Sequence, residues 1–216
     1  ILDLIMRTRT FRHEPVSNKP DLDAHAQISR KAATEGMVLL KNERDALPLA
    51  AGKKLAIFGN SAHDIIIGGT GSGDVHEAYS VALPEGLENA GYATDKALSQ
   101  AYAEHIEAAK AHRPETNPFL APPPLPELVP TAEQIGAAVA ANDVGVITIG
   151  RNSGEFIDRK AKDDFYLTEA EQTLIRNVST AFHKAGKPVV VVLNIGGVIE
   201  LASWRDQVDA ILLAWQ

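Results

Sequence analysis

Short apolar runs alternate with helical patterns along most of this chain. The clearest runs are Val144–Ile149 and Val189–Leu193, which lack the regular polar positions of a strand with one face in water. A strand of this kind is buried on both faces, as in a parallel sheet covered by helices. The alternation therefore predicts an α/β fold, namely a three-layer sandwich with a mostly parallel sheet and helices on both faces.

Capping residues mark the helices between these runs. Thr168–Lys184 starts with a capping threonine, has Glu171 in the capping-box position and is followed by Gly186. Thr131 is expected to cap a helix that ends at Ala141. The other expected elements are helices over Asp21–Glu35, Leu83–Ala90 and Leu98–His112, strands over Met37–Leu40, Lys54–Phe58 and Ile211–Ala214, a loop over Gly59–Asp74 and an exposed proline-rich insertion over Pro114–Pro130.

The composition limits the classes of function. The chain has 216 residues, 45% of them hydrophobic, which is enough for one sizeable core or for a domain with a connecting arm. Its net charge of −7 comes without a basic stripe, which argues against nucleic acid as a partner. The longest apolar runs are far too short to span a bilayer. The absence of cysteine excludes disulfides and thiolate chemistry and leaves the compartment open.

Both ends of the sequence read as internal. Ile1–Met6 has neither the charged start nor the cleavage site of a signal peptide. Ala210–Gln216 reads as a buried strand, which is a poor place for a natural terminus. We therefore expect a piece of a longer protein, in which residues 1–20 are a linker and residues 21–216 form an α/β domain.

One acidic residue stands out because of its place after a strand. Glu155 follows the run Val144–Ile149 in a short polar loop, with Gly154 beside it. The carboxyl ends of strands are where α/β sheets bind ligands, so this loop can hold a proton donor toward a substrate. The alternative is an ordinary solvated glutamate. Asp158 and Arg159 are expected to pair locally or to fix the loop.

A second candidate is the glycine-rich segment Gly68–Asp74. Closely spaced glycines let a backbone approach a ligand, as in phosphate-binding loops. No Gly-Lys-Ser/Thr ending follows, and the glycines do not open a helix, so a tightly turned loop is the simpler interpretation. The seven histidines lack the spacing of metal ligands, and no Gly-x-Ser-x-Gly motif is present, so neither a metal site nor a serine hydrolase is predicted.

Taken in order, these segments resemble the second, α/β sandwich domain of glycoside hydrolase family 3. The matching segments are His25–Glu43, Leu47-Pro48-Leu49, Lys54–Gly59, Gly71-Ser72-Gly73, Arg151–Glu155 with Asp158-Arg159, and Ala210–Trp215. The resemblance covers nearly the whole chain apart from the proline-rich stretch. It implies that residues 1–20 are the end of a TIM-like barrel and an interdomain linker, and that the sandwich domain is truncated at its C-terminus.

The resemblance also implies a function, which is retaining hydrolysis of terminal β-linked sugars by a β-glucosidase-like enzyme. Glu155 would be the general acid/base, and the nucleophile would be an aspartate of the N-terminal barrel, outside this chain. Arg151, Ser153, Phe156 and Ser72 would bind substrate, although many members have glycine at the position of Phe156. No cofactor and no metal are implied, and this fragment alone is expected to be inactive.

The competing hypothesis is a non-catalytic, flavodoxin-like module that binds a nucleotide or sugar phosphate through Gly68–Gly73. A third is a degenerate scaffold, against which the family-like loop around Glu155 argues. The sequence leaves open the sugar, the linkage, the oligomeric state and the compartment.

Overall fold

The computed structural model describes residues 1–73, 77–114, 122–152, 154–155 and 158–216. Its internal contacts divide the chain into two units, Ile1–Gly36 and Met37–Gln216. The first unit holds helices α1 (Leu2–Arg7) and α2 (Leu22–Gly36), neither of which buries a side chain. The helix predicted at Asp21–Glu35 is confirmed as α2, whereas α1 was not anticipated. The assignment of residues 1–20 to a barrel end and linker stays a prediction.

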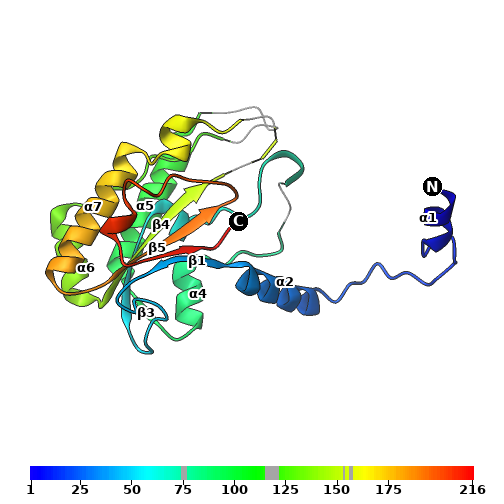
Figure 1. Ribbon diagram of the computed structural model, residues 1–216, viewed down its shortest axis with the longest axis horizontal. Coiled ribbons are helices and arrows are strands. Elements are labelled where there is room, and N and C mark those ends of the chain that lie inside the picture. The colour runs from blue at the N-terminus through cyan, green and yellow to red at the C-terminus, as the bar shows by residue number, and fades with distance from the viewer. Residues whose placement is uncertain (74–76, 115–121, 153, 156–157) are drawn as a thin grey trace. The chain divides into compact units, whose positions relative to one another are not determined.

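The second unit is built on one six-stranded sheet with the order β1-β6-β5-β4-β2-β3 (Figure 1). Every neighbouring pair is parallel except β1 and β6, which run antiparallel. The predicted, mostly parallel sheet is therefore confirmed. The strands are β1 (Val38–Asn42), β2 (Lys54–Phe58), β3 (Ala93–Thr94), β4 (Val144–Arg151), β5 (Val189–Ile195) and β6 (Ala210–Leu213).

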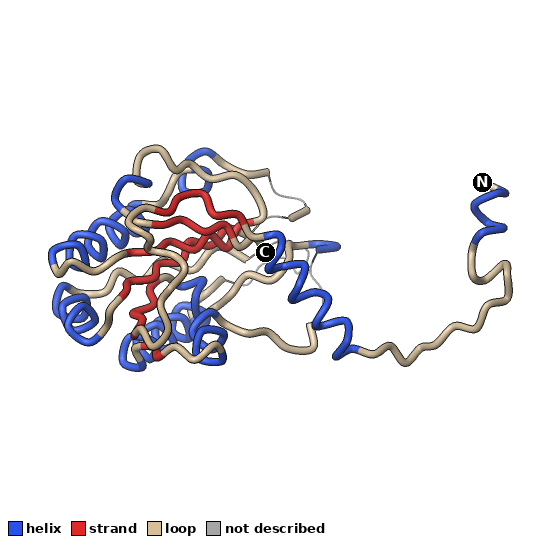
Figure 2. The backbone as a smooth tube through the Cα atoms, turned by 60° about the horizontal axis from the view of Figure 1, so that its bottom comes forward, coloured by secondary structure: helices blue, strands red, loops and turns tan. Residues whose placement is uncertain are grey.

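Helices cover both faces of the sheet, which explains why its central strands β4 and β5 are mostly apolar and buried (Figure 2). On one face, Phe58, Ile147 and Val191 pack in a cluster with side chains of α5, α6 and α7. On the other face, Leu55 and Val190 pack beside α3, α4 and the segment 46–49. These helices are α3 (Asn60–His63), α4 (Leu83–Asn89), α5 (Lys96–Ala111), α6 (Ala132–Ala141) and α7 (Glu169–Lys184).

The predicted capping signals are confirmed at two helices. Thr131 caps α6 and Thr168 caps α7, each in a capping box with the third residue of the helix. The side chain of Glu171 completes the box at α7, so its carboxylate is fixed at the start of that helix. This position becomes important at the functional site.

The proline-rich stretch differs in part from the exposed insertion that the sequence predicts. Pro122–Pro124 are exposed, but Glu127–Pro130 lie half-buried or buried against the domain. Asn60 holds this part in place, since its Nδ2 donates to the carbonyl of Pro126 at 2.8 Å. The expected loop over Gly59–Asp74 likewise contains ordered structure, because α3 follows β2 directly.

Candidate functional site

The loops that follow β2 and β4 meet at the carboxyl edge of the sheet. The two strands are parallel neighbours, so both loops leave the sheet on the same side. Gly154 forms a parallel bridge with Thr70, and the backbone N–H of Glu155 donates to the carbonyl of Thr70 at 3.4 Å. The glycine-rich loop and the loop that carries Glu155 are thereby joined.

The side chain of Glu155 is held by Ser72. The hydroxyl of Ser72 donates to Oε1 at 2.5 Å, and its backbone N–H donates to Oε2 at 3.0 Å. Ser72 is the middle residue of a 3-10 turn, Gly71–Gly73. The turn therefore presents a hydroxyl and an amide to one carboxylate.

The glycines of these loops make room for this contact. Gly71 has a φ of +68°, and a Cβ built on it would lie 2.8 Å from the Cβ of Glu155, with the carboxylate also in its way. A Cβ on Gly154 would overlap the backbone nitrogen and hydroxyl of Thr70. Only residues without a side chain fit at these two positions. The glycine-rich segment thus allows Ser72 to contact Glu155, a role that the sequence did not reveal.

The two hydrogen bonds also set the charge of the acid. Glu155 is exposed, and the Ser72 hydroxyl, followed by the Ser72 backbone N–H, lowers the pKa of its carboxyl below the ordinary value. In this arrangement Glu155 is ionised at neutral pH, which suits a proton acceptor. A role as proton donor requires a change in its surroundings.

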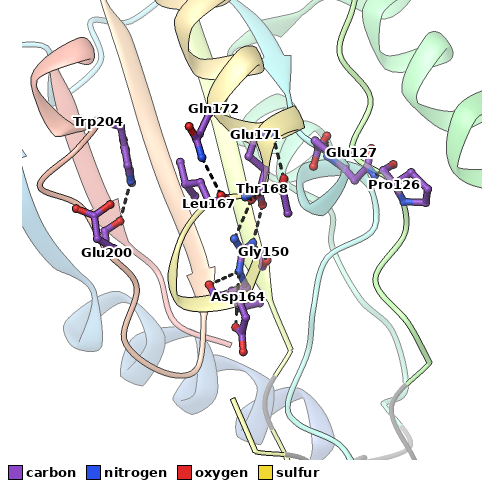
Figure 3. A network of polar contacts seen from close by, with 12 residues as sticks. Pro126, Glu127, Gly150, Asp164, Leu167, Thr168, Glu171, Gln172, Glu200 and Trp204 are labelled. Atoms are coloured by element: carbon purple, nitrogen blue, oxygen red, sulfur yellow. Dashed lines mark hydrogen bonds and ion pairs between the residues drawn. The ribbon is translucent and has the colours of Figure 1, made fainter. Parts of the chain in front are cut away.

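The side chain of Arg151 contacts the start of α7. Its side chain is 10% exposed and donates to both carboxylate oxygens of Glu171, at 2.6 and 2.8 Å. Its Nε donates to the carbonyl of Asp164 at 2.8 Å. Figure 3 shows Glu171 and Asp164 in this network of polar contacts. The expected role of Arg151 in substrate binding stays a prediction, and Ser153 and Phe156 lie outside the described residues.

Sequence reasoning missed one partly buried acid near this network. Glu127 comes from the proline-rich stretch, and its Oε1 accepts the backbone N–H of Asn60 at 2.9 Å. Burial, and to a smaller extent the charge of Glu171, raises the pKa of Glu127 to about 8. The only signal in the sequence is a single acid inside the otherwise apolar run from Leu125 to Pro130.

Residues 37–216 match the family model described as the glycosyl hydrolase family 3 C-terminal domain. The chain belongs to glycoside hydrolase family 3. The predicted resemblance, drawn from short motifs in a fixed order, is thereby confirmed. The family 3 domain begins at the same residue as the second structural unit, Met37.

Solved and curated β-glucosidases resemble all or most of the chain. The structure of β-glucosidase 3B from Thermotoga neapolitana, solved with α-D-glucose, superposes with a TM-score of 0.92 at 43% identity, and the match covers 100% of this chain and 30% of that one. β-Glucosidase A from Butyrivibrio fibrisolvens is 36% identical over 222 residues, covering 89% of this chain and 25% of its own length. A β-glucosidase from Paenibacillus barengoltzii superposes with a TM-score of 0.79 at 29% identity, covering 88% and 21% of the two chains. The chain thus spans about a quarter of the length of such relatives.

The described residues also limit which other sites the chain can carry. Among the described residues, no group of three or more histidine or acidic side chains is arranged to hold a metal ion. No helix in the same ranges is long and apolar enough to cross a membrane.

Proposed function

We propose that this domain supplies the general acid/base, Glu155, of a retaining β-glycosidase that acts on terminal β-linked sugars in the manner of a β-glucosidase. The observation that carries the proposal is the placement of Glu155. It is an exposed carboxylate at the carboxyl edge of the sheet, held by a loop from the neighbouring strand. Ligands bind at this edge in open α/β sheets. The similarity of the chain to β-glucosidases also supports the proposal.

The reaction needs a second carboxylate, which we assign to an aspartate of an N-terminal TIM-like barrel outside these 216 residues. The aspartate attacks the anomeric carbon while Glu155 gives its proton to the leaving oxygen, so a glycosyl-enzyme forms and the aglycone departs. Glu155 then removes a proton from water, which attacks the anomeric carbon and releases the sugar and the aspartate. The 216 residues alone are accordingly expected to hydrolyse no glycoside.

The protonation state of Glu155 must alternate during this cycle. The contacts with Ser72 lower the pKa of Glu155 and suit the step in which it accepts a proton from water. The donating step requires a higher pKa. Covering the carboxyl with substrate and barrel would raise it by desolvation, and the charge of the nearby nucleophile would raise it further.

Ser72 is the described residue best placed to contact the sugar beside Glu155. Its hydroxyl lies 2.5 Å from the Glu155 carboxylate, so it can exchange this acceptor for a sugar hydroxyl. Arg151, Ser153 and Phe156 remain proposed substrate contacts. No cofactor enters the mechanism.

The alternative function, a module that binds nucleotide or sugar phosphate, finds less support. It requires free amides in the glycine-rich loop, and the amide of Ser72 is used by Glu155. Calorimetric titration with ATP, NAD and sugar phosphates tests it, and binding tighter than about millimolar, roughly 4 kcal/mol, would favour the module.

The decisive experiment compares Glu155→Ala with Glu127→Gln in the full-length protein. Glu127 is the matched control because its pKa of about 8 would suit a general acid, although its carboxyl is buried. We expect Glu155→Ala to lose about 10²–10⁴-fold in turnover of glycosides with poor leaving groups and much less in the first step for activated aryl glycosides. Azide needs no base catalysis, so it should restore turnover and yield a β-glycosyl azide.

Glu127→Gln should show neither the leaving-group dependence nor the azide product. If Glu155→Ala slowed all substrates equally and gave no glycosyl azide, the acid/base would be a different residue. The same two signatures in Glu127→Gln would move the assignment to Glu127.

A further inference from the structure

We infer that Asp164 is a positioning residue that fastens both ends of the acid/base loop, through Arg151 at its start and Arg159 at its end. The inference rests on the proposed function of Glu155. Asp164 follows this loop on the way to α7 and lies within the polar network of Figure 3.

The first end of the loop is fastened at the last residue of β4. The guanidinium of Arg151 donates from Nε to the carbonyl of Asp164 at 2.8 Å, and from Nη1 and Nη2 to Glu171. The carboxylate of Glu171 is itself fixed by the capping box of α7. The start of the loop is therefore tied to β4 and to α7, two rigid elements.

The second end is fastened by the carboxylate of Asp164. Its Oδ1 accepts from Nε and Nη2 of Arg159 at 2.8 and 2.6 Å, and its Oδ2 accepts the backbone N–H of Lys160 at 2.9 Å. The remaining Nη1 of Arg159 donates to the carbonyl of Val198 at 2.6 Å. The sequence expectation that Arg159 pairs locally is confirmed, and its partner is Asp164.

The backbone around Asp164 is held in an unusual shape. It lies in the turn Ala161–Phe165, in which Lys162 (ψ 133°) and Asp163 (φ +60°) have non-helical backbone angles. The turn is closed by the N–H of Tyr166, which donates to the carbonyl of Ala161 at 2.9 Å. It is anchored from outside by the N–H of Glu200, which donates to the carbonyl of Phe165 at 2.8 Å. Asp164 is thus held in place by its own backbone contacts, and the loop is attached to it through Arg151 and Arg159.

The charges of this cluster balance. Arg151 and Arg159 face Asp164 and Glu171, and all four side chains are at most 26% exposed. Burial alone would raise the pKa of Asp164, but the hydrogen bond from Arg159 and then that of the Lys160 N–H lower it below the ordinary value. Asp164 therefore stays ionised at the pH where a glycosidase with a glutamate acid works.

The consequence concerns the position of Glu155 and not its chemistry. A proton donor must lie within hydrogen-bond reach of the leaving oxygen, and a displacement of about 1 Å can cost about 10²-fold in rate. Holding both ends of the loop limits how far Glu155 can be displaced. The hydroxyl of Ser72, from the neighbouring loop, contacts its carboxylate directly.

The test is Asp164→Asn in the full-length protein, with Asp163→Asn as the matched control. Asp163 is the adjacent acid, its side chain is 56% exposed, and asparagine tolerates its positive φ. For Asp164→Asn we expect kcat/KM for poor leaving groups to fall about 10–100-fold, because the acid is misplaced. For activated aryl glycosides, kcat/KM should fall much less. KM should stay near the wild-type value. Asp163→Asn should have the same kinetic constants as the wild type.

Two further measurements make the outcome decisive. Arg159→Lys keeps the positive charge but loses the forked contact, so it should show the same leaving-group dependence to a smaller degree. Asp164→Asn should give no glycosyl azide, since Glu155 is still present. An equal loss on all substrates, or no loss, would overturn the inference. Glu155→Ala is assayed beside it, so a failure of the proposed function appears separately, as missing azide rescue in that variant.

Discussion

The carboxylate of Glu155 accepts both the hydroxyl and the backbone N–H of Ser72, a residue 83 positions earlier in the chain. This contact joins the loop after β2 to the loop after β4. The position of the proposed acid therefore depends on residues from two strands, and it can be disturbed from the side of the glycine-rich turn without touching Glu155.

Replacing Gly71 by alanine should displace Glu155. The new Cβ would lie 2.8 Å from the Cβ of Glu155, and the φ of +68° adds backbone strain of roughly 1 kcal/mol. We expect kcat/KM to fall about 10²-fold in the full-length protein. The control is Gly52→Ala, which has a similar φ of +76° but no atom within 4 Å of the added Cβ. Equal losses in the two variants would mean that strain, not displacement of Glu155, explains the effect.

Removing the hydroxyl of Ser72 should shift the pH profile of the enzyme upward. This hydroxyl is the largest cause of the lowered pKa of Glu155, so Ser72→Ala raises that pKa. The alkaline limb of kcat/KM reports the acid that must be protonated in the free enzyme, and it should move to higher pH. Ser72→Thr keeps a hydroxyl and should keep the limb near its original place. An unchanged limb in Ser72→Ala would show that Glu155 is not the group titrating there.

The sequence was sufficient for the fold because local signals agreed with the final packing. The central strands are mostly apolar, as in the run Val189–Leu193, and capping residues such as Thr168 lie where helices begin. The short elements α3 and β3 were missed, because four residues or fewer carry no measurable period. Glu155 was selected as a candidate from its place after a strand, and its role stays a prediction.

The partners of these residues could not be predicted, because each contact joins segments far apart in sequence. Nothing near Ser72 indicates that its hydroxyl meets Glu155, and nothing near Arg151 indicates that its guanidinium turns toward Glu171. The burial of Glu127 was not predicted for a different reason. Proline excludes regular structure around it, so no periodic pattern marked the position as buried.

The buried carboxyl of Glu127 should make stability depend on pH. Its pKa is raised to about 8 from an ordinary value of 4.5, so between these values the folded state holds a proton that the unfolded state has released. Stability is then greatest near or below pH 4.5 as far as this group is concerned, and falls by up to about 1.4 kcal/mol per pH unit until pH 8.

Glu127→Gln removes this titration and should flatten the decline. Thermal unfolding of the full-length protein between pH 5 and pH 9 measures it, with Glu133→Gln, an exposed acid in the first turn of α6, as the control. Parallel pH curves for wild type and Glu127→Gln would contradict the prediction.

The ion pair between Arg151 and Glu171 should respond very differently to single and double substitutions. The two side chains are 10% and 6% exposed, so Glu171→Ala leaves a buried guanidinium without its partner. We expect a loss of about 3–5 kcal/mol of folding free energy. Glu171→Gln should lose less, because glutamine can still accept the N–H of Thr168 and complete the capping box.

The double variant Arg151→Met/Glu171→Leu removes both charges and leaves none unpaired. Its stability should therefore lie above that of Glu171→Ala and approach the wild type, since apolar pairs often replace buried ion pairs with little net change. Calorimetric unfolding of the full-length proteins gives the order of the four forms. A double variant less stable than Glu171→Ala would mean that the geometry of the pair, including the Arg151 contact to the Asp164 carbonyl, stabilises the fold by more than charge neutralisation. Activity measured on the same samples separates the two roles, because the double variant should stay folded yet lose the fastening of the acid/base loop at its first end.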